Sequence, residues 1–194
     1  MELVVREAVA ADADDIAHAH VEGWRTGYRG QVPDEFLDSD AFAAFRRDGW
    51  RAILTGRLPD VHRPDDSIFV AADQGRAVGF GHIGRERGDH DRGELLGFYV
   101  HPDYWGTGAA QQLIERCHIG LAELADEWLL WVLRDNPRAR AFYERNGWSP
   151  GSGDEVVHAE WDGPVMDGAP KLDTPLPEVQ YRRSRQGVST SSVL

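Results

Sequence analysis

The sequence contains a single cysteine, Cys117. One thiol cannot form a disulfide within the chain or a cysteine-based metal cluster, which excludes the disulfide-stapled and cysteine-rich zinc classes. The chain also lacks any run of about 18 apolar residues, so no transmembrane helix is expected. Its first residues, Met1-Glu2-Leu3, do not show the basic and then apolar pattern of a secretory signal. These absences predict a cytoplasmic protein that does not associate with membranes.

Basic residues are scarce compared with acidic ones. The chain has 21 Lys and Arg residues and 33 Asp and Glu residues, which gives a net charge of −12 at pH 7. A field of that sign repels nucleic acid and anionic membranes and favours cationic or neutral partners, although solubility alone accounts for it equally well. The composition is otherwise that of an ordinary globular protein, and 194 residues favour one domain. We expect this domain to cover residues 1–185, with a disordered polar tail over residues 186–194.

The spacing of apolar residues and breakers predicts alternating strands and helices. Strands are expected at residues 3–6, 67–72, 77–85, 94–100, 128–133, 155–161 and 179–183. Helices are expected after Asp12, over about 36–54, over 106–124 and over 138–145, where Gly147 provides the left-handed C-terminal cap. This order indicates a mixed sheet with helices on its faces, in which residues 94–133 form a right-handed parallel strand–helix–strand unit.

The stretch from Glu94 to Ala110 carries a phosphate-binding pattern. A strand ends at Pro102, and a loop of small residues over 106–110 then opens a helix. Such a loop exposes backbone N–H groups at the positive end of a helix, where an anion binds well. It is not a Walker loop, because no Lys follows Gly108, and a dinucleotide fingerprint would need Gly or Ala in place of Gln111.

A second glycine pattern, G-x-G-x-x-G, occurs at Gly79, Gly81 and Gly84. These residues lie inside a predicted strand that runs into the charged residues 85–87, whereas the dinucleotide fingerprint runs into an apolar helix. We interpret this match as fortuitous.

Two blocks of the chain resemble motifs of the GNAT superfamily of acyl-CoA N-acyltransferases. Residues 105–110 resemble its acetyl-CoA signature, which is Arg or Gln, two residues, Gly, one residue, then Gly or Ala. Trp105 departs from the usual Arg or Gln, and Thr107 stands where a basic residue is common, so phosphate binding is expected to draw on charges elsewhere. Residues 136–148 resemble the family's Asn-x-x-Ala-x-x-Phe-Tyr-Glu-x-x-Gly-aromatic motif. The two motifs occur in order and at the family's spacing, within a similarity that spans about residues 4–183.

The resemblance implies an α/β (α+β) GNAT fold: a twisted, mostly antiparallel mixed sheet of about six to seven strands, with helices on both faces and a central βαβ unit. It implies an N-acetyltransferase that moves the acetyl group of acetyl-CoA, or another short acyl-CoA, to a primary amine by direct attack through a tetrahedral intermediate. The acceptor would be a small-molecule or peptide amine, and the chain would be a monomer or homodimer. The alternative is a non-catalytic acyl-CoA-binding or regulatory module, because a fold does not dictate function.

The resemblance also assigns roles on the acyl-CoA side. The pantetheine arm would lie between the strand ending at Val100 and the strand ending near Leu133, and a backbone N–H there could stabilise the oxyanion. Tyr143 would be the general acid for the departing thiolate, because a phenol is neutral at pH 7 and can donate a proton. Asn136 would contact the cofactor or cap its helix. The implied cofactor-binding positions are Phe98, Tyr99, Val100, Trp105, Gly106, Thr107, Gly108, Ala109, Ala110, Asn136 and Tyr143.

A base is useful on the acceptor side, because the amine must lose a proton before or during attack. Glu94 is the first candidate, since it starts the central strand at a place where some GNAT enzymes have a catalytic Glu. The alternative for Glu94 is a solvated residue that closes a charged turn. His82, in the neighbouring strand, is the second candidate, and a chain of bound water would also serve.

An aromatic wall is expected to bind the acceptor. Trp24 lies on the first predicted helix and Tyr28 near its end, and the resemblance implies that the loop after this helix shapes the acceptor pocket. Such rings can hold a cationic amine through cation–π contacts, unless they serve only in packing. With the net negative charge, they predict a cationic amine bound in a negative cleft. No metal is expected, because His18 and His20 have no partner at convincing metal-ligand spacing and suit the surface or the core better.

Overall fold

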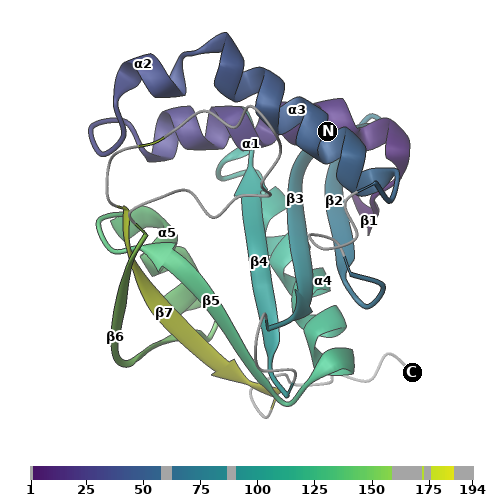
Figure 1. The fold of residues 1–194 in the computed structure, drawn as a ribbon. Helices are drawn as coiled ribbons and strands as arrows, with labels where there is room; N and C mark the ends of the chain where they lie inside the picture. Colours follow the sequence, from purple (N-terminus) through teal and green to yellow (C-terminus); the bar gives the residue numbers. More distant parts are fainter. Residues whose placement is uncertain (1, 58–62, 87–90, 159–171, 173–175, 186–194) are drawn as a thin grey trace.

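A computed structural model describes residues 2–57, 63–86, 91–158, 172 and 176–185 (Figure 1). The strands of this part form one sheet in the order β1-β2-β3-β4-β5-β7-β6. All neighbouring strands are antiparallel except β4 and β5, which are parallel. The sheet is thus mixed and mostly antiparallel, as predicted. The strands are β1 (Leu3–Glu7), β2 (Ser67–Asp73), β3 (Arg76–Arg85), β4 (Gly93–Val100), β5 (Glu127–Leu133), β6 (Ser149–His158) and β7 (Leu176–Ser184).

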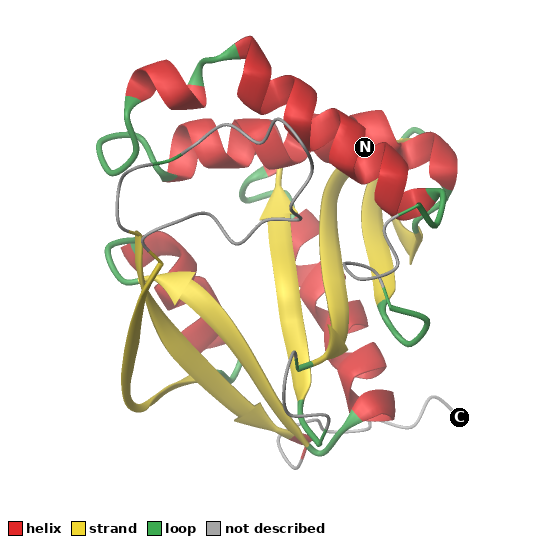
Figure 2. Ribbon diagram, in the orientation of Figure 1, coloured by secondary structure: helices red, strands yellow, loops and turns green. Residues whose placement is uncertain are grey.

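Helices cover both faces of the sheet (Figure 2). The alternation of side chains along a strand sends neighbouring residues of β2 into different cores. Phe69 and Ala71 pack beneath α4, whereas Ile68 and Val70 pack beneath α1 and α3. No helix within the described ranges is both long and apolar enough to cross a membrane. The helices are α1 (Ala13–Gly27), α2 (Asp34–Leu37), α3 (Asp40–Leu54), α4 (Ala109–Leu124) and α5 (Pro137–Arg145), with short 3-10 turns at Ala10–Asp12 and Pro102–Tyr104.

The segment β4–α4–β5 is the predicted parallel unit. Helix α4 buries Leu113, Cys117 and Leu121 completely against the sheet. It approaches β3 so closely that a side chain at Gly81 would collide with Sγ of Cys117. The G-x-G-x-x-G pattern lies within β3, as predicted, and not at the start of a helix. The close approach of Cys117 gives Gly81 a packing role that the sequence did not indicate.

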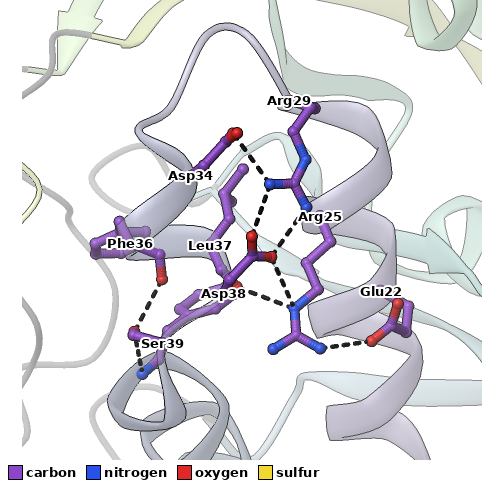
Figure 3. Close-up of polar contacts among 9 residues, drawn as sticks. Glu22, Arg25, Arg29, Asp34, Phe36, Leu37, Asp38 and Ser39 are labelled. Atoms are coloured by element: carbon purple, nitrogen blue, oxygen red, sulfur yellow. Dashed lines mark hydrogen bonds and ion pairs between the residues drawn. The ribbon is translucent and has the colours of Figure 1, made fainter.

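The region predicted as one helix over 36–54 is two helices, so this prediction was wrong. Ser39 separates them, because its Oγ donates to the carbonyl of Phe36 (2.9 Å) at the end of α2 and accepts from the N–H of Phe42 (3.1 Å) at the start of α3 (Figure 3). A serine N-cap of this kind begins a new helix even where the apolar spacing continues.

Other helix and strand boundaries also differ from the predicted ones. Helix α4 begins at Ala109, not at Gly106, because the backbones of Gly106 (φ 78°) and Gly108 (φ 93°) are left-handed and cannot be helical. Strand β6 begins at Ser149, before the predicted residue 155, with an irregular register between Pro150 and Glu155. Trp161, the predicted end of that strand, and the predicted tail at 186–194 lie outside the described residues.

Candidate active site

Strands β4 and β5 separate part-way along their length. Their parallel pairing is limited to Gly93 with Trp128, Glu94 with Leu129 and Leu95 with Leu130, and the strands then diverge (Figure 2). On the other side of β4, His82 pairs with Gly97 and Ile83 with Leu95, so Leu96 is the extra residue of a β-bulge. A bulge bends its strand and increases the local twist, which accounts for the divergence at this point. Backbone N–H and C=O groups beyond Leu95 that face β5 therefore need a partner other than the ladder.

A cleft of about 1520 Å³ occupies this opening and extends to α1, α3 and α5. Nearly all the predicted site residues line it, although they come from distant parts of the chain. The exceptions are Thr107, whose Oγ1 donates to the carbonyl of Tyr104 (2.7 Å), and Ala109, which is fully buried. The predicted residues that line the cleft are Trp24, Tyr28, His82, Glu94, Phe98, Tyr99, Val100, Trp105, Gly106, Gly108, Ala110, Asn136 and Tyr143.

The start of α4 faces the cleft. Gly108 occupies the N-cap position with a φ of 93°, and the first turn of the helix carries no acidic side chain. The first N–H groups of a helix have no partner within it and lie at its positive end. This end of α4 is consequently well suited to an anionic ligand.

Arg138 places a positive charge beside this loop. Its guanidinium carbon lies 2.9 Å from the centroid of the Trp105 ring, and both residues line the cleft. The indole N–H of Trp105 donates to the carbonyl of Val100 (2.9 Å), which orients the ring. Burial lowers the pKa of Arg138. Helix α5 thus places a positive charge beside Trp105, where the loop itself has no basic side chain.

Tyr143 is buried at the wall of the cleft. Its ring packs against Phe98, with centroids 6.4 Å apart, and against Phe142, with centroids 5.6 Å apart. Its hydroxyl forms no hydrogen bond with any residue in the described part of the chain. Burial, followed by the nearby phenol of Tyr99, raises the pKa of Tyr143, so the phenol stays protonated at neutral pH. It can therefore act as a proton donor.

Asn136 lines the cleft and caps α5. Its Oδ1 accepts from the N–H of Ala139 at 3.0 Å. The capping role is confirmed, while a contact with the cofactor stays a prediction.

The aromatic wall is built around the phenol of Tyr99. The indole N–H of Trp24 donates to this oxygen (3.0 Å), and the phenol oxygen of Tyr28 lies 2.9 Å from it. The face of Trp24 already carries a cation of the chain itself, because the guanidinium carbon of Arg46 lies 5.0 Å from its centroid. Burial lowers the pKa of Arg46 to about 9. The two predicted acceptor residues therefore line the cleft and also serve in packing.

Ion pairs hold the end of α1 that bears this wall (Figure 3). Arg25 donates from Nε to the carbonyl of Leu37 (3.0 Å). Arg29 binds both carboxylate oxygens of Asp38 (2.9 Å each) and pairs with Asp34 (3.0 Å). These contacts join the end of α1 and the turn after it to α2 and its C-cap.

The candidate bases come from adjacent strands. Glu94 is half-buried at the start of β4, and His82 is buried in β3 with its Nε2 3.2 Å from Oδ2 of Asp66. His20 is a packing residue, as expected, since its Nδ1 accepts from the indole N–H of Trp50 (3.0 Å) and its ring lies 4.3 Å from that of Tyr99.

Comparison with known families agrees with this geometry. The sequence model of the Acetyltransferase (GNAT) family matches residues 21–148. The chain belongs to the GNAT family. The match spans the aromatic wall, the glycine loop and the Tyr143 helix, and it leaves out β7, which also lines the cleft through Leu176 and Glu178.

Relatives of this GNAT chain are named as N-acetyltransferases. An uncharacterized N-acetyltransferase of Bacillus subtilis, YuaI, is 30% identical over 139 residues, which are 70% of this chain and 74% of the relative. An uncharacterized N-acetyltransferase of Mycobacterium tuberculosis is 40% identical over 88 residues, 43% of this chain and 53% of the relative. The fold matches the PaiA N-acetyltransferase of Thermoplasma acidophilum in complex with coenzyme A, with a TM-score of 0.68, 18% identity and coverage of 95% of this chain and 99% of that one.

The cleft of this GNAT chain also contains residues that sequence reasoning missed. Arg138 stands inside the second motif, and the absence of a basic residue at Trp105 and Thr107 was the signal that could have singled it out. Arg46 and Asp66 lie in segments without a motif, so only the tertiary structure brings them to the site.

Proposed function

We propose that this GNAT chain is an N-acetyltransferase that transfers the acetyl group of acetyl-CoA to a primary amine by direct attack. The observation that carries the proposal is the opening between β4 and β5, with the protonated phenol of Tyr143 at its wall. An extended thioester arm can lie in such an opening and take up the backbone hydrogen bonds that the ladder leaves unmade.

The diphosphate of coenzyme A would bind at the start of α4. The N–H groups around Gly108 and the guanidinium of Arg138 both border this part of the cleft. Backbone donors at a helix N-terminus and an arginine fork are complementary to phosphate oxygens.

The reaction would begin with attack of a neutral amine nitrogen on the thioester carbonyl. A backbone N–H of β4, in the stretch from Phe98 to Val100, would stabilise the oxyanion. Collapse of the intermediate breaks the C–S bond, and Tyr143 would give its proton to the departing thiolate. The proton of the amine would pass to a base on β3 or β4, where His82 and Glu94 are available.

The acceptor side carries charges of both signs. Glu86, Glu94 and Glu178 line the cleft together with Arg46 and Arg63. The acidic groups suit a cationic amine, as the net charge of −12 suggested, while the arginines suit polar or acidic groups elsewhere on the same acceptor.

A panel of amines tests the function directly. The protein is mixed with acetyl-CoA and each amine, and free thiol and the acetylated product are measured. We expect thiol release that depends on the amine. Binding of acetyl-CoA without amine-dependent release across small amines, amino acids and peptides would instead favour the non-catalytic module.

Arg138→Met tests the phosphate site. Loss of charge-assisted hydrogen bonds worth about 1.5–3 kcal/mol should weaken coenzyme A binding about 10- to 150-fold in calorimetry. Arg140→Met is the matched control, because this arginine of the same helix bonds to Tyr181 and the carbonyl of Arg134 instead. Acetylated pantetheine, which lacks the diphosphate, should bind the Arg138→Met variant and the wild type equally. Unchanged coenzyme A affinity in the variant would refute this role for Arg138.

A further inference from the structure

His82 and Asp66 form a buried pair at the acceptor side of the cleft. Both residues are only 7% exposed, and His82 lines the cleft. We propose that Asp66 orients the imidazole of His82 so that its Nδ1 accepts the proton of the attacking amine. The inference rests on the proposed acetyl transfer and names the group that removes the proton, with Asp66 as its positioning residue.

The hydrogen bonds of Asp66 determine which imidazole nitrogen is basic. Its side chain is fully buried, and Oδ2 lies 3.2 Å from Nε2 of His82 while accepting from the backbone N–H of Arg63 (3.0 Å). A buried carboxylate needs such donors. Because a carboxylate only accepts, Nε2 carries the hydrogen, and the lone pair of the neutral imidazole is on Nδ1.

The chain leaves space for this carboxylate. Gly84 lies two residues after His82 on β3, and a Cβ there would collide with Oδ1 of Asp66. Any larger residue at position 84 would displace Asp66 from the imidazole. Gly84 thus leaves room for the His82–Asp66 pair. A larger residue at this position would disturb the geometry of the pair without changing its charge.

The pair lies beside the point where the sheet opens. His82 is opposite Gly97 on β4 and next to the bulge at Leu96, where β4 leaves β5. The oxyanion donor proposed above belongs to the same strand, directly after this bulge. An amine that attacks from the acceptor side therefore passes the imidazole.

Several charged or titratable groups line the same cleft as His82. Asp66 bonds to it from the segment before β2, and the cleft is also lined by Arg63 from that segment, Glu94 from β4 and Glu86 after β3. Helices α1 and α3 contribute His20 and Arg46 to the same cleft. The carboxylates favour the imidazolium that forms on proton transfer, and the arginines oppose it.

The imidazole is better matched to the step than a carboxylate. Its ordinary pKa is about 6.5, against about 4.3 for Glu, and a general base works best near the operating pH. The C–N bond forms as the amine proton moves to Nδ1 of His82, and the C–S bond breaks as the thiolate takes the proton of Tyr143. The imidazolium then returns its proton to solvent, and the phenolate regains one.

The pH dependence of turnover tests the pair. In the wild type, kcat should rise with pH as the imidazolium loses its proton. Asp66→Asn removes the charge that stabilises the imidazolium, so the rise should move to lower pH while the plateau of kcat falls about 10²- to 10⁴-fold. The KM for acetyl-CoA should not change. A purely structural role would not move the pH profile.

Matched variants make the test specific. Asp65→Asn removes the same charge from the neighbouring position, where the side chain is 43% exposed and pairs with Arg85, and it should leave the profile in place. His82→Gln should abolish the rise. Gly84→Ala should reproduce the Asp66→Asn effect with the charge retained, and serves if Asp66→Asn does not fold. A folded Asp66→Asn with the wild-type profile, or a His82→Gln that keeps the rise, would overturn the proposal.

Nitrogen NMR of the imidazole separates this inference from the proposed function, because it needs no turnover. We expect the Nε2–H tautomer for His82 in the wild type and a lower imidazole pKa in Asp66→Asn. An unchanged pKa in Asp66→Asn, or the Nδ1–H tautomer in the wild type, would overturn the pairing. A wild type with these NMR signatures that releases no thiol with any amine would instead overturn the proposed function and the catalytic role of the pair with it.

Discussion

Replacement of Tyr143 by Phe should separate catalysis from stability. The change removes one hydroxyl, which faces the cleft and has no hydrogen-bond partner among the described residues, and leaves the ring in its aromatic packing. If the phenol protonates the departing thiolate, kcat should fall about 10²- to 10⁴-fold. This corresponds to about 2.7–5.4 kcal/mol of transition-state stabilisation.

The free energy of unfolding should hardly change in the same variant. No protein hydrogen bond is lost, so the difference should stay within about 0.5 kcal/mol. Tyr181→Phe is the matched control. Its phenol donates to Glu144 (2.8 Å) and accepts from Arg140 (3.0 Å), so its removal should cost about 1.5–3 kcal/mol. For a chain of this size that lowers Tm by about 3–12 °C, with kcat near that of the wild type.

Steady-state thiol release and thermal unfolding give kcat and Tm for both variants. The dissociation constant of acetyl-CoA, from calorimetry, should be similar in Tyr143→Phe and wild type, because the phenol acts in the transition state. A Tyr143→Phe enzyme with wild-type kcat would refute the general-acid role. A large loss of Tm in that variant would show that the hydroxyl is structural.

Further variants probe the loop, the acceptor side and the N-terminal ion pair. Gly108→Glu adds a side chain and a negative charge at the start of α4 and should abolish acetyl-CoA binding in calorimetry while the fold survives. Its control is Gly75→Glu, at a φ of 84° in the β2–β3 hairpin, which carries the same backbone strain and should bind acetyl-CoA as the wild type does. Glu94→Gln should raise KM for cationic amines without moving the pH profile, whereas a shift toward the amine's own pKa, near 10 for a lysine-like group, would make Glu94 the base. Burial tends to raise the pKa of Asp12, but the hydrogen bonds from Arg6 outweigh it and lower this pKa. The ion pair therefore stabilises the folded state by about 1–2 kcal/mol above about pH 4, and this stabilisation is lost as the pH falls through the folded-state pKa of Asp12. The Tm difference between wild type and Asp12→Asn should therefore be full at pH 7 and shrink in acid; a constant difference would contradict the ion-pair account.

Local sequence patterns predicted most of the fold. The strands predicted at 67–72 and 77–85 are the antiparallel neighbours β2 and β3, and the helix predicted over 106–124 contains α4. Helix boundaries were less accurate, because they depend on single hydrogen bonds such as that of Ser39 with Phe42. The spacing of apolar residues continues across this cap and gives no sign of it, so α2 and α3 were predicted as one helix.

The sequence by itself determined the family, the glycine loop and the Tyr143 helix, because backbone conformation and motif spacing are properties of neighbouring residues. Only the tertiary structure decided which side chains surround these motifs. The stacking of Arg138 on Trp105, the approach of Arg46 to Trp24 and the pairing of Asp66 with His82 join residues far apart in the chain. Such contacts depend on how the helices and strands pack, and one sequence without that packing does not specify them.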